Sequence, residues 1–274
     1  MNNKTRIIYD NSSVSDHLNK RKPRKGGYVT AVNHETGEVI FKQLPNKVMV
    51  AGSAFTVAKV FGITPPVLTQ TYNNYLGLDN TVNEAYLGDG VRDSEKICLW
   101  CVGTDGCGSE MSMVYDVDPS KFIGRDSIVP FRYQNPNNDL QDELRTKYFG
   151  RKQSNGMIAY YFKAFEAPPT FTQQYTDGTP IDTNIQDIEK KDEIESYVEF
   201  KLSLTKEDCR DWFISTVGIK QAKINCISLC TAYPKYIDGV LYYQDIRSFS
   251  RYNFSTESLY DISKGIDFTY QLYY

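Results

Sequence analysis

The chain has 274 residues and a globular composition, with 24% charged residues, 41% hydrophobic residues and a formal net charge of −3. This balance excludes a general affinity for nucleic acid or for anionic membranes. The sequence has no run of about 18 apolar residues for a membrane span, and its N-terminus lacks the apolar core of a signal peptide. We therefore expect a protein that is made in the cytosol and has no membrane partner.

Residue usage favours contact surfaces over catalysis. The chain contains 21 tyrosines and 14 phenylalanines but only two histidines, His17 and His34. Aromatic side chains are enriched where proteins meet proteins, whereas histidine is the usual acid–base and metal-binding residue. The composition thus points toward a protein that binds other proteins.

Residues 1–27 form a basic segment with few aromatic residues. Seven Lys and Arg residues oppose two Asp residues, so the segment carries +5 and the remainder carries −8. The cluster KRKPRKGG places five cations close together: Lys20, Arg21, Lys22, Arg24 and Lys25. We predict a flexible N-terminal arm over residues 1–27 and a single β-rich body over residues 28–274. The arm is a disordered tail, an assembly arm that folds onto an acidic neighbour such as the body itself, or a short nucleic-acid contact without sequence specificity.

The first part of the body is predicted to be a hairpin followed by a helix. Residues 28–32 and 38–44 are strand-like and flank a turn that contains His34 and Gly37. Residues 53–62 have the serine start, apolar spacing and terminal glycine of a short helix. A second helical turn or loop is expected within residues 64–80.

The stretch KICLWCVG, residues 96–103, carries a C-x-x-C spacing in an apolar, β-prone run. Residues three apart in a strand point to opposite faces, so Cys98 and Cys101 are not expected to share a metal ion. Cys226 and Cys230 would lie about 13 Å apart in a strand, which is too far for one ion. We predict six buried free thiols; a zinc or thiol enzyme remains the alternative and would need at least three converging cysteines.

The second half of the body is predicted from alternation and capping signals. Strand-like segments are 112–117, 127–133, 156–167, 196–204, 221–233 and 240–246. Helices are expected over 139–150, 206–218 and 255–265. The fold class that follows is α+β and predominantly β, an antiparallel β-sandwich-like body with a few short helices and an extended N-terminal arm.

The chain ends in an alternating strand, IDFTYQLYY. A strand at the terminus must be paired, either within its own sheet or along the edge of a neighbouring subunit. We therefore single out one candidate interface strand, carried by Phe268, Tyr270, Tyr273 and Tyr274.

Familiar catalytic motifs are absent from the sequence. It contains no phosphate loop, no H-E-x-x-H and no G-x-S-x-G. Asp89 with Asp93, and Asp177 with Asp182, are paired carboxylates that suit calcium binding or a glycosidase. All four lie in glycine-bearing turns, where aspartate is favoured for backbone hydrogen bonding alone. We predict no catalytic residue, no metal and no cofactor.

Several short phrases resemble the virion structural proteins of large tailed bacteriophages. They lie between residues 46 and 274: NKVMVAGSAFTVAKVFG, IVPFRY, LRTKYFGRK, AYYFKAFEAPP, the turn Asp177-Gly178, YVEFKLSLTKEDCRDWF, AKINCISLC, RYNFSTESL and DFTYQLYY. The resemblance covers roughly residues 30–274, and the arm lies outside it. It implies an assembly protein without catalytic residues, located at the neck between head and tail.

The expected function is a ring-forming neck or collar subunit that joins head to tail and binds copies of itself and other virion proteins. It would be made in the host bacterial cytoplasm and end up in the virion. The alternatives are a baseplate or other tail component, or a carbohydrate-binding β-sandwich that uses exposed tyrosines as sugar platforms.

Overall fold

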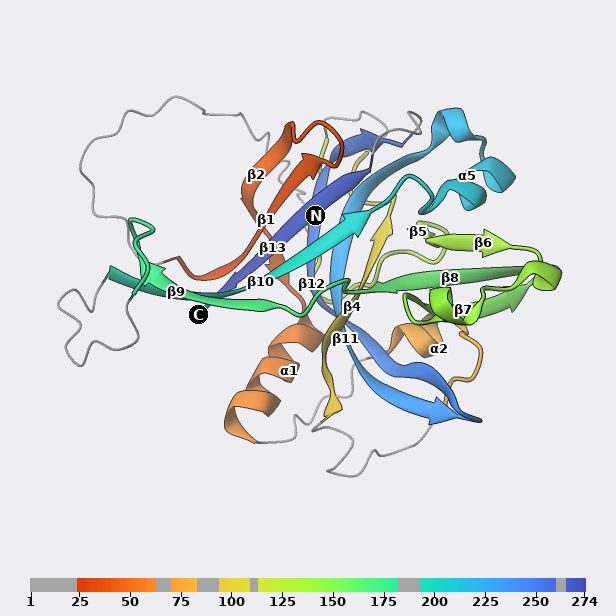
Figure 1. Cartoon of the computed structure of the whole chain (residues 1–274), viewed down its shortest axis with the longest axis horizontal. Helices are drawn as coiled ribbons and strands as arrows, with labels where there is room; N and C mark the ends of the chain where they lie inside the picture. The colour runs from red at the N-terminus through yellow and green to blue at the C-terminus, as the bar shows by residue number, and fades with distance from the viewer. Residues whose placement is uncertain (1–23, 63–69, 83–93, 109–112, 182–192, 260–264) are drawn as a thin grey trace, which may run out of the picture.

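The structure is a computed structural model that describes residues 24–62, 70–82, 94–108, 113–181, 193–259 and 265–274. Two antiparallel sheets pack in a sandwich-like body, with short helices around them (Figure 1). The predicted fold class, an antiparallel and predominantly β body with a few short helices, is confirmed.

The five-stranded sheet has the order β2-β1-β13-β10-β9. Its strands are β1 (Gly26–Asn33), β2 (Val39–Pro45), β9 (Thr170–Tyr175), β10 (Ile194–Leu204) and β13 (Ile266–Tyr273). The alternation predicted for β10 and β13 places Phe200 and Tyr270 opposite each other on the face that packs on the second sheet.

The eight-stranded sheet has the main order β3-β12-β11-β4-β8-β6, with β5 paired to β4 and β7 paired to β8. Its strands are β3 (Lys47–Val48), β4 (Lys96–Gly103), β5 (Ile128–Val129), β6 (Arg132–Gln134), β7 (Tyr148–Ser154), β8 (Met157–Ala164), β11 (Lys223–Ile237) and β12 (Val240–Ser258). The β11–β12 hairpin consists of the two longest described strands and runs from the upper to the lower part of the view in Figure 1.

Four short α-helices accompany the sheets in the described part of the chain: α1 (Val50–Phe61), α2 (Tyr72–Leu76), α4 (Asp142–Arg145) and α5 (Arg210–Thr216). Single 3-10 turns lie at Pro136–Asn138 and Ile219–Gln221. The helix predicted over 53–62 is confirmed and begins three residues earlier. The helix predicted over 206–218 is confirmed in its central part as α5.

Two apolar clusters lie on opposite faces of the eight-stranded sheet. The first lies between the sheets and contains Trp100, Phe131, Phe200 and Phe268. The second lies beneath α2, contains Tyr72 and Phe162, and holds four of the six cysteines. All six cysteines are buried and none forms a disulfide, so the prediction of buried free thiols is confirmed.

A bulge in β4 corrects the expected arrangement of the C-x-x-C pair. Leu99 is paired with Cys230 and Ile97 with Thr231, which leaves Cys98 as the extra residue. A bulge reverses the alternation locally, so Cys98 and Cys101 both pack in the cluster beneath α2 rather than on opposite faces.

Two predicted helices are wrong over part of their length. The helix expected over 139–150 is limited to α4, because the aromatic residues Tyr148 and Phe149 are buried in β7 and pair with β8. The hairpin that joins β7 to β8 turns at Asn155 and Gly156, both with positive φ. The helix expected over 255–265 is replaced by the end of β12 as far as Ser258, and residues 260–264 lie outside the described part.

The prediction of an interface strand at the C-terminus is also corrected. β13 lies inside its own sheet, with β1 hydrogen-bonded on one side and β10 on the other. Phe268, Tyr270 and Tyr273 are buried, and Tyr274 is exposed. With both backbone edges paired, β13 has no edge to offer a neighbour. The two edge strands of this sheet are β2 and β9, which among the described strands pair only with β1 and β10, respectively.

Candidate functional site

The part of the predicted arm that the structure describes is attached to the body. Arg24 donates from Nε and Nη2 to the two carboxylate oxygens of Glu195, at 3.2 and 2.7 Å, and its guanidinium lies 4.3 Å from the ring centre of Tyr273. The ordered body thus begins before residue 28, since β1 starts at Gly26. Lys25 follows Arg24, whereas Lys20, Arg21 and Lys22 lie outside the described residues.

The buried carboxylate of Glu195 depends on this anchor. Its side chain is only 2% exposed and also accepts a hydrogen bond from Gln174. Burial alone would raise the pKa of Glu195, but the hydrogen bonds from Arg24 and Gln174 and the charge of Arg24 lower it overall. The junction between arm and body is therefore a specific ion pair.

The other residues singled out in the sequence do not converge on one site. Asp177 accepts a hydrogen bond from the amide of Thr179, as a turn aspartate does, while Asp89, Asp93 and Asp182 lie outside the described residues. His34 lies in the predicted turn and its Nδ1 is 2.8 Å from Asp267. In the described ranges, no group of three or more His, Cys, Asp or Glu residues is placed to hold a metal ion. Nor does the described part contain a helix of the length and apolarity that crossing a membrane requires.

The thiols are poorly suited to act as nucleophiles. Burial raises the pKa of Cys98 to about 12 and also raises the pKa of Cys209 and Cys230. A reactive cysteine needs the opposite, an electropositive and accessible environment that stabilises the thiolate. The Sγ atoms of Cys101 and Cys230 are 4.0 Å apart in this core, where the thiols fill apolar space.

Helix α1 is attached to β12 through a glycine. A Cβ added at Gly52 would lie 2.0 Å from the carbonyl oxygen of Phe249, so only glycine lets the helix approach this closely. Phe55 packs edge-to-face on Phe249 with ring centres 6.0 Å apart. These contacts fix which side of α1 faces the sheet.

The opposite side of α1 is apolar and exposed. Val50, Val57, Val60 and Phe61 expose 46%, 37%, 65% and 70% of their surface. Val50, Ala54, Val57 and Phe61 follow the spacing i, i+4, i+7, i+11. This spacing is typical of a helix that packs on another element. We call Val50, Val57, Val60 and Phe61 the α1 apolar face.

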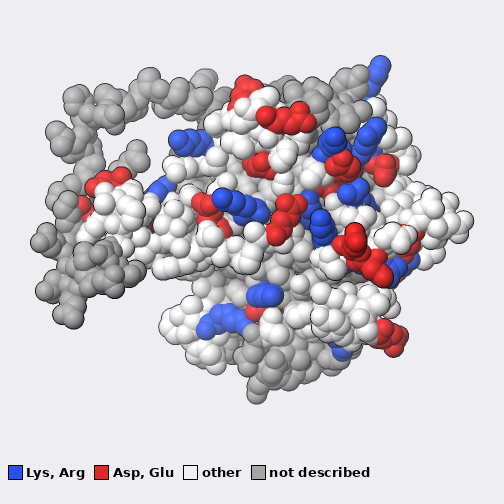
Figure 2. All heavy atoms as spheres, viewed as in Figure 1, with Lys and Arg blue, Asp and Glu red and all other residues white. Residues whose placement is uncertain are grey.

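A hollow lies at the start of the α1 apolar face. It has a volume of about 600 Å³, and its lining includes Met49, Val50, Tyr75, Pro119 and Phe122. Val50 belongs to both the hollow and the apolar face, so the two are continuous. In Figure 2, the region of α1 shows a few charged side chains beside uncharged surface, and Lys, Arg, Asp and Glu are interspersed over the strands above it. This combination of an apolar helix and a hollow suits a protein partner.

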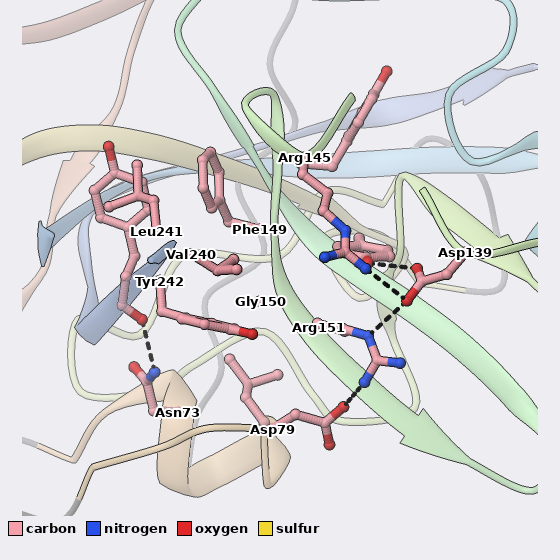
Figure 3. A pocket seen from close by; sticks show the side chains of 14 residues that line it. Asn73, Asp79, Asp139, Arg145, Phe149, Gly150, Arg151, Val240, Leu241 and Tyr242 are labelled. Atoms are coloured by element: carbon pink, nitrogen blue, oxygen red, sulfur yellow. Dashed lines mark hydrogen bonds and ion pairs between the residues drawn. The ribbon is translucent and has the colours of Figure 1, made fainter. Parts of the chain in front are cut away.

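A second, smaller cavity lies where β7 meets the start of β12 and the turn that follows α2. Its volume is about 150 Å³ and it is partly open to solvent. Figure 3 shows Val240, Leu241, Tyr242 and Phe149 on one side and the charged residues Asp79, Asp139, Arg145 and Arg151 on the other. One wall is thus apolar and the other is polar.

The polar wall is a network of two guanidinium groups and two carboxylates. Arg151 donates from Nε to Asp139, at 3.2 Å, and from Nη1 to Asp79. Arg145 donates from Nη2 to the same Asp139 oxygen at 3.3 Å and from Nε to the Leu140 carbonyl at 3.1 Å. The four charges balance, so the wall carries no net charge.

The protonation states of this wall favour recognition over acid–base catalysis. Burial would raise the pKa of Asp139, but hydrogen bonds from Tyr160 and the Leu140 amide and the charge of Arg151 lower it overall. Burial, and then the hydrogen bond to Asp139, raise the pKa of Tyr160, which stays a donor. A general acid needs a pKa near the working pH, and neither group has one.

A third polar cluster lies inside the body and ties the sheets together. Lys163, 2% exposed, donates to fully buried Asp208 at 2.9 Å and to the Ser203 carbonyl at 2.6 Å. Asp208 also accepts from the Tyr148 hydroxyl at 2.7 Å and from the Thr205 amide at 2.9 Å. The Thr205–Asp208 contact lies in the turn that precedes α5, whose N-cap residue is Cys209. The contacts of this cluster join β7, β8 and β10, and its member Tyr148 also lines the smaller cavity.

Comparison with models of known protein families, with curated proteins and with solved structures gives no match for this chain.

Proposed function

We propose that this chain is a non-enzymatic structural subunit of a phage virion, a ring-forming protein of the neck or collar that binds copies of itself and adjacent virion proteins. The observation that carries the assembly role is the α1 apolar face with its adjoining hollow. The phage context comes from the resemblance of the sequence phrases to virion proteins. A baseplate or other tail position is the alternative, and it would use the same surface.

The energetic argument concerns the cost of leaving this face in water. Covering each large apolar side chain stabilises an interface by about 1–2 kcal/mol. Single exposed apolar residues are common on monomers, but here four lie on one 12-residue helix beside a hollow. A protein partner that covers the face accounts for its composition.

A closed ring needs a second surface, because its contacts are head-to-tail. The edge strand β9 supplies one candidate, with Phe171 69% exposed. Part of the edge is occupied by the chain itself, since the Tyr175 amide donates to the Thr179 carbonyl. Among the described residues, the edge beside Phe171 is the portion of β9 that remains for an incoming partner.

The test is the mass of the purified full-length chain in solution, measured by light scattering at several concentrations. We expect a discrete oligomer that Phe61→Asp reduces to a monomer. The matched control is Ile214→Asp, which alters an exposed apolar residue of α5 (51% exposed) away from the α1 apolar face. A full-length chain that stays monomeric, or a Phe61→Asp variant that assembles normally, contradicts the proposal.

Mixing two variants distinguishes a head-to-tail ring from a symmetric dimer. Phe61→Asp keeps the β9 edge intact, and Phe171→Asp keeps the α1 apolar face intact. If one surface binds the other, each variant alone is monomeric and the mixture forms a one-to-one dimer. A mixture that remains monomeric rejects β9 as the second surface.

A chain that starts at Arg24 tests the arm in the same assay, and its unimpaired assembly rejects a role for residues 1–23.

A further inference from the structure

We infer that the cavity between β7, β12 and the turn after α2 binds one neutral sugar ring, so that the protein recognises a monosaccharide or the terminal sugar of a glycan. This inference stands apart from the proposed assembly role, because the cavity shares no lining residue with the α1 apolar face. It rests on the size, the charge and the two unlike walls of the cavity.

The size of the cavity sets the size of the ligand. A volume of about 150 Å³ accommodates a single six-membered ring. A peptide segment or a nucleotide is larger, and such ligands occupy pockets of about 300 Å³ or more. One sugar ring matches the space.

The charge of the polar wall sets the charge of the ligand. Arg145 and Arg151 are balanced by Asp79 and Asp139. A phosphate or carboxylate ligand would meet two fixed carboxylates, and a cationic ligand would meet two guanidinium groups. A neutral ligand avoids both repulsions.

The polar wall still offers hydrogen bonds to a neutral ligand. Arg145 uses Nε and Nη2 within the protein, and no described residue accepts a hydrogen bond from its Nη1. Asp79 accepts at Oδ2 from Arg151 and from the Gln153 amide, which leaves Oδ1 as an acceptor. A donor and an acceptor on one wall suit hydroxyl groups, since each hydroxyl both donates and accepts.

The opposite wall provides the apolar contact that the C–H face of a sugar ring needs. Tyr242 reaches from β12 toward the side of the cavity where Asp79 and Arg151 lie (Figure 3). Phe149 packs edge-to-face on Tyr243 with ring centres 4.7 Å apart, which holds this wall in place. An aromatic wall facing a polar wall matches a molecule with an apolar face and a polar rim.

The test uses the full-length chain and ligand-observed NMR with free sugars. The neutral probes are glucose, galactose, mannose and N-acetylglucosamine, and the anionic probes are glucuronic acid and inorganic phosphate. We expect at least one neutral sugar to bind, and Tyr242→Ala to weaken that binding by about tenfold or more. The matched control is Tyr236→Ala on the same hairpin, which changes an exposed tyrosine outside the cavity and should bind as the native chain does.

A second variant keeps the inference falsifiable if loss of Tyr242 disturbs the hairpin. Asp79→Asn removes one negative charge, so the wall gains a net positive charge and should now favour glucuronic acid over glucose. An unchanged unfolding temperature in both variants shows that the body is intact. The inference is overturned if no neutral sugar binds, if binding survives Tyr242→Ala, or if the native chain prefers the anions.

A further experiment distinguishes a glycan from a free monosaccharide as the natural ligand. It measures binding to immobilised glycans whose terminal sugar is the one that binds in the NMR test. A cavity for one ring predicts recognition of the terminal sugar irrespective of the next one along. Binding of the free sugar without any binding to the glycans assigns the site to a small metabolite. Phe61→Asp should retain sugar binding, so failure of the assembly proposal and failure of this one are separable.

Discussion

Lys163 and Asp208 are charged and lie inside the body, whereas Val57, Val60 and Phe61 are apolar and lie on its surface. The buried charges are accounted for within the chain, because hydrogen bonds from three elements surround them. By contrast, no described part of the chain covers the exposed apolar side chains of α1. Buried charges whose hydrogen bonds are all made within the chain serve to hold the fold together. Apolar side chains that the chain leaves exposed indicate a surface for a binding partner.

The largest expected effect comes from breaking the buried ion pair. Lys163→Met leaves Asp208 buried without its cation and should lower the free energy of unfolding by about 3–5 kcal/mol. Urea denaturation followed by fluorescence measures the change. The control Glu166→Gln alters the other, half-exposed carboxylate near Lys163 and should cost less than about 0.5 kcal/mol. Equal effects would show that the Lys163–Asp208 pair is not the essential contact.

A somewhat smaller effect is expected where α1 meets β12. Gly52→Ala places a methyl group against the Phe249 carbonyl and should destabilise the protein by about 2–3 kcal/mol, because backbone must move to admit it. Thermal unfolding tests this, with Ser53→Ala at the neighbouring exposed position as control. A Gly52→Ala variant as stable as Ser53→Ala would mean that α1 is not fixed in the described orientation.

The third-largest effect is expected at the Arg24–Glu195 ion pair, whose contribution to stability depends on pH. Arg24→Met should lower the free energy of unfolding by about 1–2 kcal/mol at pH 7. The pKa of Glu195 is lowered in the folded state from about 4.5, so the stabilisation is complete above that pH and is lost as the pH falls through the folded value. Denaturation at pH 7 and pH 3 should show the difference between the two chains shrinking at the lower pH. A difference that grows on acidification contradicts this sign.

The smallest effect on stability is expected on the α1 apolar face. Phe61→Ser removes an exposed side chain (70% exposed) and should change the stability of the monomer by less than about 0.5 kcal/mol, because little burial is lost. The stability of the native chain must be measured at a dilution at which it is monomeric, because assembly would add to its apparent stability. A large loss of stability would place Phe61 in the core of the subunit and remove the argument for a partner surface.

Local patterns in the sequence predicted much of the sheet structure. The alternation of β10 and β13, the apolar run of β4 and the hairpin of β1 and β2 all appear as strands close to their expected positions. The β7–β8 hairpin is not among the predicted elements, although Asn155-Gly156 is a strong turn signal. Capping signals at residues 139 and 150 favour a helix before this turn, whereas burial of Tyr148 and Phe149 decides for the strand.

The candidate sites were less accessible to sequence reasoning. The α1 sequence VAGSAFTVAKVF is apolar around most of its circumference, so it does not reveal which side faces the sheet. The smaller cavity, for which we infer sugar binding, draws on residues from Asn73 to Tyr243, which are 170 positions apart. No local pattern links Asp79 with Arg151, and only their ion pair in the folded chain brings them together.

The sequence by itself determined the β-rich class, the burial of the six thiols and the alternation of β10 and β13, because these follow from residue type and alternation over a few positions. Only the tertiary structure decided that β13 is an inner strand, that Cys98 and Cys101 share a side of β4, and which side of α1 is left in water. Each of these depends on contacts between segments far apart in the chain. Strand order, a bulge and a glycine contact with Phe249 set them, and none of these is encoded in a short stretch of residues.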